Sequence, residues 1–201
     1  MVEVKDYYKT FGIDIVAVDF DKGGPTAASL RAVQMSSRKF STHVSVVERA
    51  IQQIKEKMRS IITLLPYDIP SKILLHITIA ATMSINTVSR KANDGLSAFS
   101  ILHQKTQDYK AQFALAPGEY VEVHTISNND VARPRTVSAV ALHPDPDNLN
   151  EWHFYSLDTG ETFIRHYNDA YPLPISSQVV DRINYLASKD PVVADPSVNE
   201  R

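Results

Sequence analysis

The sequence contains no cysteine, which excludes disulfide bonds, thiolate zinc sites and cysteine nucleophiles. It also has no uninterrupted apolar run of about 18 residues, the length that a membrane-spanning helix needs. The most apolar segment, residues 73–85, is shorter and carries His76, Thr78 and Thr82. The N-terminus, MVEVKDYYKT, is acidic and aromatic, so it does not resemble a secretory signal. These absences predict an intracellular protein with no membrane partner.

Net charge is also small, but it is unevenly placed along the chain. A formal net charge of −2 is too small to identify a nucleic-acid-binding protein by charge alone. Residues 1–112 hold 15 Lys and Arg against 10 Asp and Glu, a net charge of +5. Residues 113–201 hold 6 Lys and Arg against 13 Asp and Glu, a net charge of −7. A basic first part and an acidic second part indicate two units with different partners.

The first part has the apolar spacing of two consecutive helices. In HVSVVERAIQQIKEKMRSII (43–62) the apolar residues recur at steps of three and four, so they share one side of an amphipathic helix. LPYDIP (65–70) ends this helix, because proline cannot continue it, and Pro70 can open a second helix at 71–88. The second helix is apolar nearly all round, so we expect it to be buried. The apolar stripe of the first helix consists of Val47, Ile51, Ile54, Met58, Ile61 and Leu65.

From about residue 113 the pattern changes from helix to strand. Segments 119–126, 136–142 and 152–167 predict a small β domain over 113–174, with Trp152 and Phe154 in its core. Asp-Thr-Gly-Glu predicts a hairpin turn with Gly160 at positive φ. A helix is expected at 176–189 and a disordered tail after it. An earlier strand is expected at 11–20, whereas residues 26–42 are poorly patterned.

Two interpretations of Glu48 compete at the start of the first helix. In the first, Ser45 and Glu48 form a capping box, and the carboxylate favours the positive end of the helix dipole. In the second, Glu48 belongs to a polar stripe that could hold a divalent metal at one end and a phosphate backbone along the rest. That stripe consists of Glu48, Gln52, Lys55 and Arg59, and Lys39, Arg49 and Lys57 add positive charge nearby.

Short motifs along most of residues 11–190 occur in the order of one known family. HVSVVERAIQQIKEKMRSII followed by LPYDIP resembles the last core helix of retroviral-type integrases, in the version found in copia-type retrotransposon polyproteins. FGIDI resembles the final strand of that core, and INTVSRKANDGLSAFSIL resembles the segment that closes it. APGEYVEVHT, ARPRT, AVAL, EWHFYSLDTGETFIR and PLPISSQVVDRINYLASKD resemble the SH3-like domain and the connector that follow. Residues 24–41 match poorly.

The resemblance implies an α+β fold in three parts. The C-terminal fragment of a ribonuclease-H-like integrase core, mainly helices, would occupy 1–112. A small SH3-like β-barrel would occupy 113–174, and a helix with a disordered tail 175–201. In that family two aspartates and one glutamate bind two divalent metal ions for phosphoryl transfer to DNA. Glu48 matches the third carboxylate, and Gln52 and Lys55 match positions that face DNA.

The sequence departs from the family at the two aspartates. They are expected on strands before FGIDI, where Asp6 is the one aspartate present, and Asp14 matches a position within the final strand. One carboxylate cannot hold two metal ions about 4 Å apart. We therefore expect no strand transfer by this chain alone and no cofactor. Mg²⁺ or Mn²⁺ would bind at Glu48 only if the missing aspartates completed the site.

Three functional hypotheses follow. A truncated integrase-like protein with a former role in DNA integration would bind DNA weakly through phosphate contacts and, if it kept that role, act in the nucleus. Alternatively, exposed apolar helix faces would pair two chains or bind a partner helix, which makes the chain a protein-interaction module. A decayed open reading frame without a selected function is the third. The candidate nucleic-acid-binding residues are Lys39, Arg49, Gln52, Lys55 and Arg59.

The seven histidines give no metal signature in the sequence. HxxxH and HExxH spacings are absent, and the zinc-binding region of the integrase family would lie upstream. We therefore expect no zinc site. DKGGP (21–25) lacks the Gly-Lys-Ser/Thr ending of a phosphate-binding loop. The histidines that the spacing leaves scattered include His103, His124, His143, His153 and His166.

Overall fold

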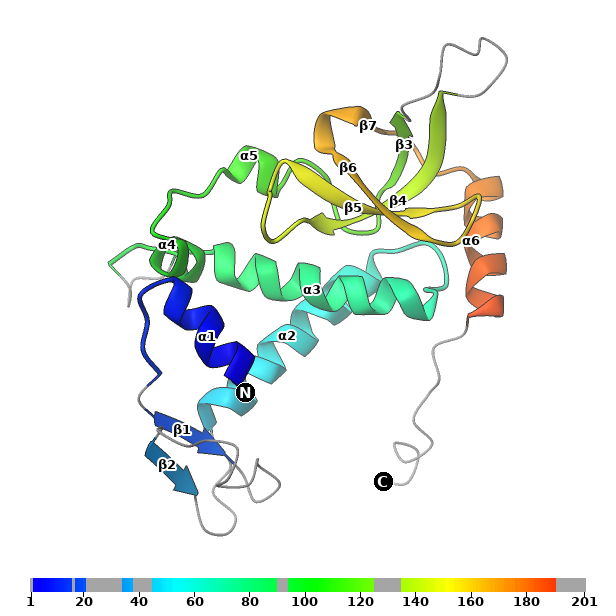
Figure 1. The fold of residues 1–201 in the computed structure, drawn as a ribbon. Helices are drawn as coiled ribbons and strands as arrows, with labels where there is room; N and C mark the ends of the chain where they lie inside the picture. The colour runs from blue at the N-terminus through cyan, green and yellow to red at the C-terminus, as the bar shows by residue number, and fades with distance from the viewer. Residues whose placement is uncertain are drawn as a thin grey trace, which may run out of the picture.

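Helices lie before and after a five-stranded antiparallel sheet, which confirms the expected α+β class (Figure 1). The structure is a computed structural model and describes residues 2–15, 17–20, 34–37, 45–89, 94–124 and 135–190. Within these ranges, no helix combines the length and the apolar character that crossing a membrane requires.

Two long helices, α2 (Ser45–Thr63) and α3 (Ser71–Thr87), precede the sheet and agree with the predicted pair. Backbone N–H groups of Leu64 and Leu65 donate to carbonyls three residues back, which tightens the last turn of α2 before Pro66. α3 lies against the sheet, and α2 crosses α3 (Figure 1). The buried side of α3 includes Ile73, Ile77, Ala80 and Ala81.

The N-terminus of α3 is capped by a residue from the far end of the chain. Pro70 precedes α3, and its side chain has no hydrogen-bonding group. Instead, Ser71 Oγ donates to Asp190 Oδ1 at 2.6 Å, and the Lys72 backbone N–H donates to Asp190 Oδ2 at 3.3 Å. A carboxylate is favourable at the positive end of a helix dipole. Asp190 therefore ties the end of α6 (Ser177–Lys189) to the start of α3.

Five antiparallel strands form the sheet: β3 (Tyr120–His124), β4 (Thr136–Pro144), β5 (Glu151–Ser156), β6 (Thr162–His166) and β7 (Ala170–Pro172). The first four pair in sequence order. A short 3₁₀ helix, η3 (Tyr167–Asp169), then leads to β7, which returns to pair with β3. The order is β6-β5-β4-β3-β7, so β6 and β7 are the open edges among the described strands. Gly160, in the β5–β6 turn, has a φ of +72°, as predicted.

One face of the sheet packs against the helices. Val140 and Leu142 of β4 lie in the same buried cluster as Ile73 and Ile77 of α3. Because residues on both sides of position 112 share this cluster, the two expected units meet in a common core, and the boundary between them stays a prediction. The cluster is completed by Tyr67, Tyr155, Leu157 and Ile183, with Met58, Ile61 and Ile62 of α2 and Leu65 just after it packed at its side.

The other face of the sheet surrounds two aromatic side chains. Trp152 and Phe154 of β5 are 1 % and 0 % exposed, which confirms their predicted core position. The Trp152 indole N–H donates to the backbone carbonyl of Ala111 at 3.0 Å. Ala111 belongs to α5 (Tyr109–Gln112), a short helix that the sequence did not predict. This hydrogen bond satisfies the buried indole and fixes α5 to the sheet.

The predicted strand at 11–20 is wrong in its first half. α1 (Val2–Thr10) is followed by a turn in which Ile13 donates its backbone N–H to the Tyr8 carbonyl and Gly12 has a φ of +72°. The segment from Phe11 to Ile13 therefore forms the C-terminal turn of α1 and is not a strand. Within 11–20 the described strand is β1 (Ala17–Phe20), which pairs in parallel with β2 (Gln34–Ser37). A short helix, α4 (Ala98–His103), follows α3, and the tail after 190 lies outside the described residues.

Gly118 joins the end of α2 to the sheet, and it gives a stability prediction. Its N–H donates to the Ala141 carbonyl and its carbonyl accepts from the Tyr67 hydroxyl, each at 2.8 Å. Its φ is +89°, and an added Cβ would collide with Leu65 Cδ2. We expect Gly118→Ala to lower the free energy of unfolding by about 2 kcal/mol or more, as measured by urea denaturation.

Gly95→Ala is the matched control for this prediction. Gly95 also has a positive φ, +81°, but no described atom lies within 4 Å of the position its Cβ would take. We expect this variant to lose about 1 kcal/mol, the cost of the backbone conformation alone. Equal losses in the two variants would show that the contact with Leu65 is unimportant.

Candidate nucleic-acid interface and histidine cluster

The polar stripe of α2 lies on the solvent side of the helix. The described residues proposed to contact DNA, together with Glu48, are all exposed: Glu48, Arg49, Gln52, Lys55 and Arg59. Gln52 Nε2 donates to Glu56 Oε1 at 2.9 Å, which holds the amide along the helix surface. α2 carries four Lys and Arg and two Glu, a net charge of +2. Lys39 lies outside the described residues.

Glu48 lies in the first turn of α2, where a carboxylate suits the helix dipole. In the part of the chain that the structure describes, the one group of three or more side chains able to share a metal is formed by histidines and does not include Glu48. Asp6 and Asp14 are exposed and belong to no such group either. The side-chain contacts of Ser45 fall outside the described residues, so the capping box stays a prediction.

The apolar stripe that begins in α2 and ends at Leu65 is partly buried toward its C-terminal end. Met58, Ile61 and Leu65 pack against the main core. Val47 and Ile51, in the N-terminal half, are 52 % and 47 % exposed. That half of α2 extends away from the sheet toward β1 (Figure 1). The first three turns of α2 therefore present both cationic and apolar side chains to solvent.

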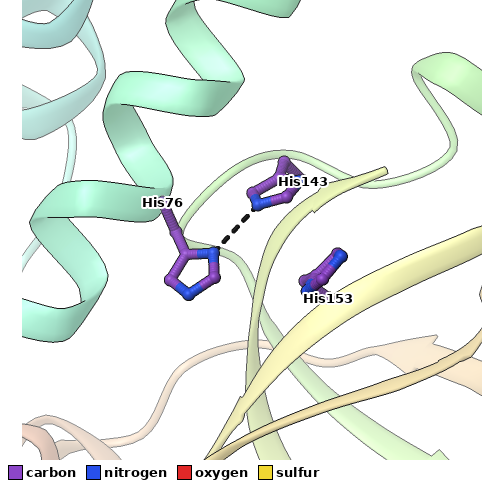
Figure 2. A group of neighbouring side chains, drawn as sticks. All are labelled: His76, His143 and His153. Atoms are coloured by element: carbon purple, nitrogen blue, oxygen red, sulfur yellow. Dashed lines mark hydrogen bonds between the residues drawn. The ribbon is translucent and has the colours of Figure 1, made fainter. Parts of the chain in front are cut away.

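Three histidines from three elements meet between α3 and the sheet, and we call them the histidine cluster (Figure 2). His76 lies in α3 and His143 in β4, and His153 of β5 is the register partner of His143. One ring nitrogen of each lies within 4.8 Å of the others. His76 Nδ1 and His143 Nε2 are 2.9 Å apart, and the rings of His143 and His153 stack with centroids 4.5 Å apart.

An irregularity in β4 turns His143 toward α3. Successive residues of a regular strand point to opposite faces of the sheet. Leu142 nevertheless packs in the cluster that contains Ile73 and Ile77, and its neighbour His143 bonds to His76 of the same helix. The β4–β5 register shifts between Ala141 and His143. Such a bulge re-aims a side chain, and here it brings a polar ring to the helical side of the sheet.

Hydrogen bonds fix where the cluster carries its protons. His143 Nδ1 donates to the Pro144 carbonyl at 2.7 Å, so the neutral ring keeps its lone pair on Nε2, the atom that faces His76. His153 Nε2 donates to Asp145 Oδ2 at 3.0 Å. Asp145 Oδ1 in turn accepts the backbone N–H groups of Asp147 and Asn148. A carboxylate that orients an imidazole in this way is typical of the surroundings of metal-bound histidine.

Burial keeps His143 and His76 neutral. The pKa of His143 is lowered to about 4, mainly by burial and also by the two neighbouring imidazoles, while its hydrogen bond to Pro144 acts in the opposite direction. The pKa of His76 is lowered by burial first and by His153 second. Burial acts to raise the pKa of Asp145, but its hydrogen bonds from the Asp147 N–H and from His153 hold it below its ordinary value. Neutral imidazole is the form that binds metals.

Two of the histidines expected to be scattered, His143 and His153, lie together in the structure, and His76 joins them. Sequence spacing cannot join His76 to a pair on two other elements, because 67 positions separate it from His143. One signal was present: His143 and His153 flank the turn-rich segment PDPDNLNEW between two predicted strands. A hairpin places the residues that flank its turn opposite each other, so this pair was predictable and the third member was not.

The buried His143 gives a pH prediction for the protein in the presence of a chelator. Between about pH 4 and pH 6.5 an unfolded histidine binds a proton that folded His143 does not. The unfolded state then binds more protons, so the free energy of unfolding falls as the pH drops through this window. Over the whole window the free energy of unfolding should fall by roughly 3 kcal/mol. Urea denaturation across this pH range measures it.

His143→Gln removes the titrating group, so we expect a flatter dependence of unfolding free energy on pH. His124→Gln is the control, because His124 is exposed at the end of β3. The control should keep the slope of the unmodified protein. If His143→Gln also keeps that slope, another group is responsible.

Comparison with known proteins assigns no family. No protein-family model matches the chain, and a search of curated proteins finds no significant match. The polar stripe of α2 and the histidine cluster are therefore the features of the described structure that point to a function.

Proposed function

We propose that the chain is a copia-type integrase-like fragment that binds nucleic acid through α2 and carries out no strand transfer by itself. The exposed polar stripe of α2 is the observation that carries this proposal. Lys55 and Arg59 are one helical turn apart, so they share a surface and can reach successive phosphates. Contacts of this kind give affinity without sequence specificity.

The order of the elements supports the proposed ancestry. A parallel strand pair, β1 and β2, precedes α2, whereas FGIDI, which the resemblance assigned to the final strand of the core, begins with the turn that ends α1. Glu48 lies in the first turn of α2, and α3 is the apolar helix that follows. The four-strand meander, with β7 returning beside β3, is compatible with an SH3-like domain after that core.

The proposed lack of strand transfer follows from metal chemistry. Two-metal catalysis needs two divalent cations about 4 Å apart, each held by several anionic oxygens. Glu48 supplies one carboxylate, and the described residues bring it into no group of three metal-binding side chains. A single exposed carboxylate binds Mg²⁺ too weakly to fix its geometry.

Nucleic-acid binding gives a salt-dependent prediction. We expect the Kd for a duplex of about 25 base pairs, measured by fluorescence anisotropy, to rise about 10- to 50-fold between 50 and 200 mM salt, as for two or three phosphate contacts. Lys55→Glu with Arg59→Glu should weaken binding and reduce the salt slope by about 2. Lys105→Glu with Lys110→Glu makes the same charge change at exposed positions outside α2 and should keep the slope.

Two results would contradict the proposal. Absence of binding at low salt, or binding that salt does not weaken, would remove the nucleic-acid interface. Nicking or joining of DNA that requires Mg²⁺ or Mn²⁺ and is lost in Glu48→Gln would show that the chain assembles an active site.

A second function is favoured by the exposure of Val47 and Ile51. A pair of apolar side chains on a charged helix can form the centre of a helix–helix contact between two chains. This function predicts a mass of two chains by light scattering, and a mass of one chain for Ile51→Asp. Leu75→Asp is the control, because Leu75 is 64 % exposed on α3. A monomer at all concentrations excludes this function.

A further inference from the structure

We propose that the histidine cluster binds one divalent transition-metal ion, best fitted by Zn²⁺, through one ring nitrogen each of His76, His143 and His153. The ion would join α3 to β4 and β5. This site is separate from α2, so it does not depend on the nucleic-acid proposal.

The donor set selects the class of metal. Imidazole nitrogens favour Zn²⁺, Cu²⁺, Ni²⁺ and Co²⁺, whereas Mg²⁺ and Ca²⁺ require oxygen ligands. Three histidines with an open fourth position form an established zinc ligand set, in which water takes the fourth position. The side chains of His153 and Asp145 are 20 % and 18 % exposed, so one side of the cluster is open to water and to an entering ion.

The distances in the cluster are close to those that zinc needs. Zn–N bonds of about 2.0–2.1 Å in a tetrahedron place two ligand nitrogens about 3.3 Å apart. His76 Nδ1 and His143 Nε2 are 2.9 Å apart, and all three nitrogens lie within 4.8 Å of one another. Zinc binding therefore requires the His76 and His143 nitrogens to separate slightly and the third nitrogen to come closer.

The protons are already arranged for binding at two of the rings. The lone pair on His143 Nε2 points at the cluster, because Nδ1 is committed to the Pro144 carbonyl. Asp145 is not one of the three ligands, but it orients His153 by a hydrogen bond, as carboxylates next to many metal-bound histidines do. His76 needs one change. Its Nδ1 proton moves to Nε2, so that the lone pair replaces the hydrogen bond to His143, and no net proton is released.

Metal binding is tested on the full chain with the metals alone. Isothermal titration with Zn²⁺ should give one ion per chain, and Co²⁺ should produce the intense visible absorption of a tetrahedral site. We expect His76→Gln and His153→Gln each to weaken Zn²⁺ binding at least 100-fold. These two side chains are half-buried, so both variants should fold, as circular dichroism can verify. Zn²⁺ should also raise the Tm of the unmodified protein and leave that of His76→Gln unchanged.

Two further variants sharpen the test. Asp145→Asn keeps an oxygen that accepts the Asp147 and Asn148 N–H groups but loses the charge beside His153, so we expect Zn²⁺ to bind 10- to 100-fold more weakly. His124→Gln, outside the cluster, should leave the affinity unchanged. The proposal is wrong if Zn²⁺ does not bind at 100 μM, if His76→Gln binds as tightly as the unmodified protein, or if His124→Gln causes the same loss as the cluster variants.

Discussion

The packing of α3 against one face of the sheet is the constraint on which the rest of the structure depends. Ile73 and Ile77 are 0 % and 2 % exposed, and burial of a side chain of this size contributes about 2–3 kcal/mol. The same contact fixes the rotation of α3 about its axis. His76 immediately precedes Ile77, so that rotation determines that its ring meets His143 on β4. The main core and the histidine cluster are therefore consequences of one packing arrangement.

The two candidate sites lie in opposite environments, and this decides what each can do. Side chains on the polar face of α2 are exposed, so any charge they offer acts at long range and is weakened by salt. In the histidine cluster, by contrast, His143 is 2 % exposed and the other two side chains are half-buried, so an unpaired polar atom is costly there. His143 and His153 each have a hydrogen-bond partner outside the cluster, Pro144 and Asp145. These partners allow polar rings to remain next to the core and also orient them.

Sequence periodicity predicted the long helices, the β5–β6 hairpin and the buried Trp152, because each depends on residues close together in the chain. It did not predict β7, because this strand has three residues and includes a proline, too little for a strand pattern. β7 pairs with β3 at an edge, where Pro172 is tolerated. Periodicity identified the apolar stripe of α2. It did not predict that Val47 would stay half exposed, because an apolar pattern does not specify which element covers that side of the helix. The histidine cluster depends on tertiary packing and a strand irregularity, and neither has a local signal.

The cap that Asp190 supplies to α3 has a consequence for synthesis of the chain on the ribosome. Ser71 and Asp190 are 119 positions apart, so the carboxylate that completes the first turn of α3 is made long after the helix itself. At about 5–20 residues per second, the delay is roughly 6–24 s. During this time α3 is a nascent segment with a largely apolar surface and an unfinished end. Until translation passes residue 190, this apolar helix therefore lacks both its cap and the part of the core that Ile183 supplies.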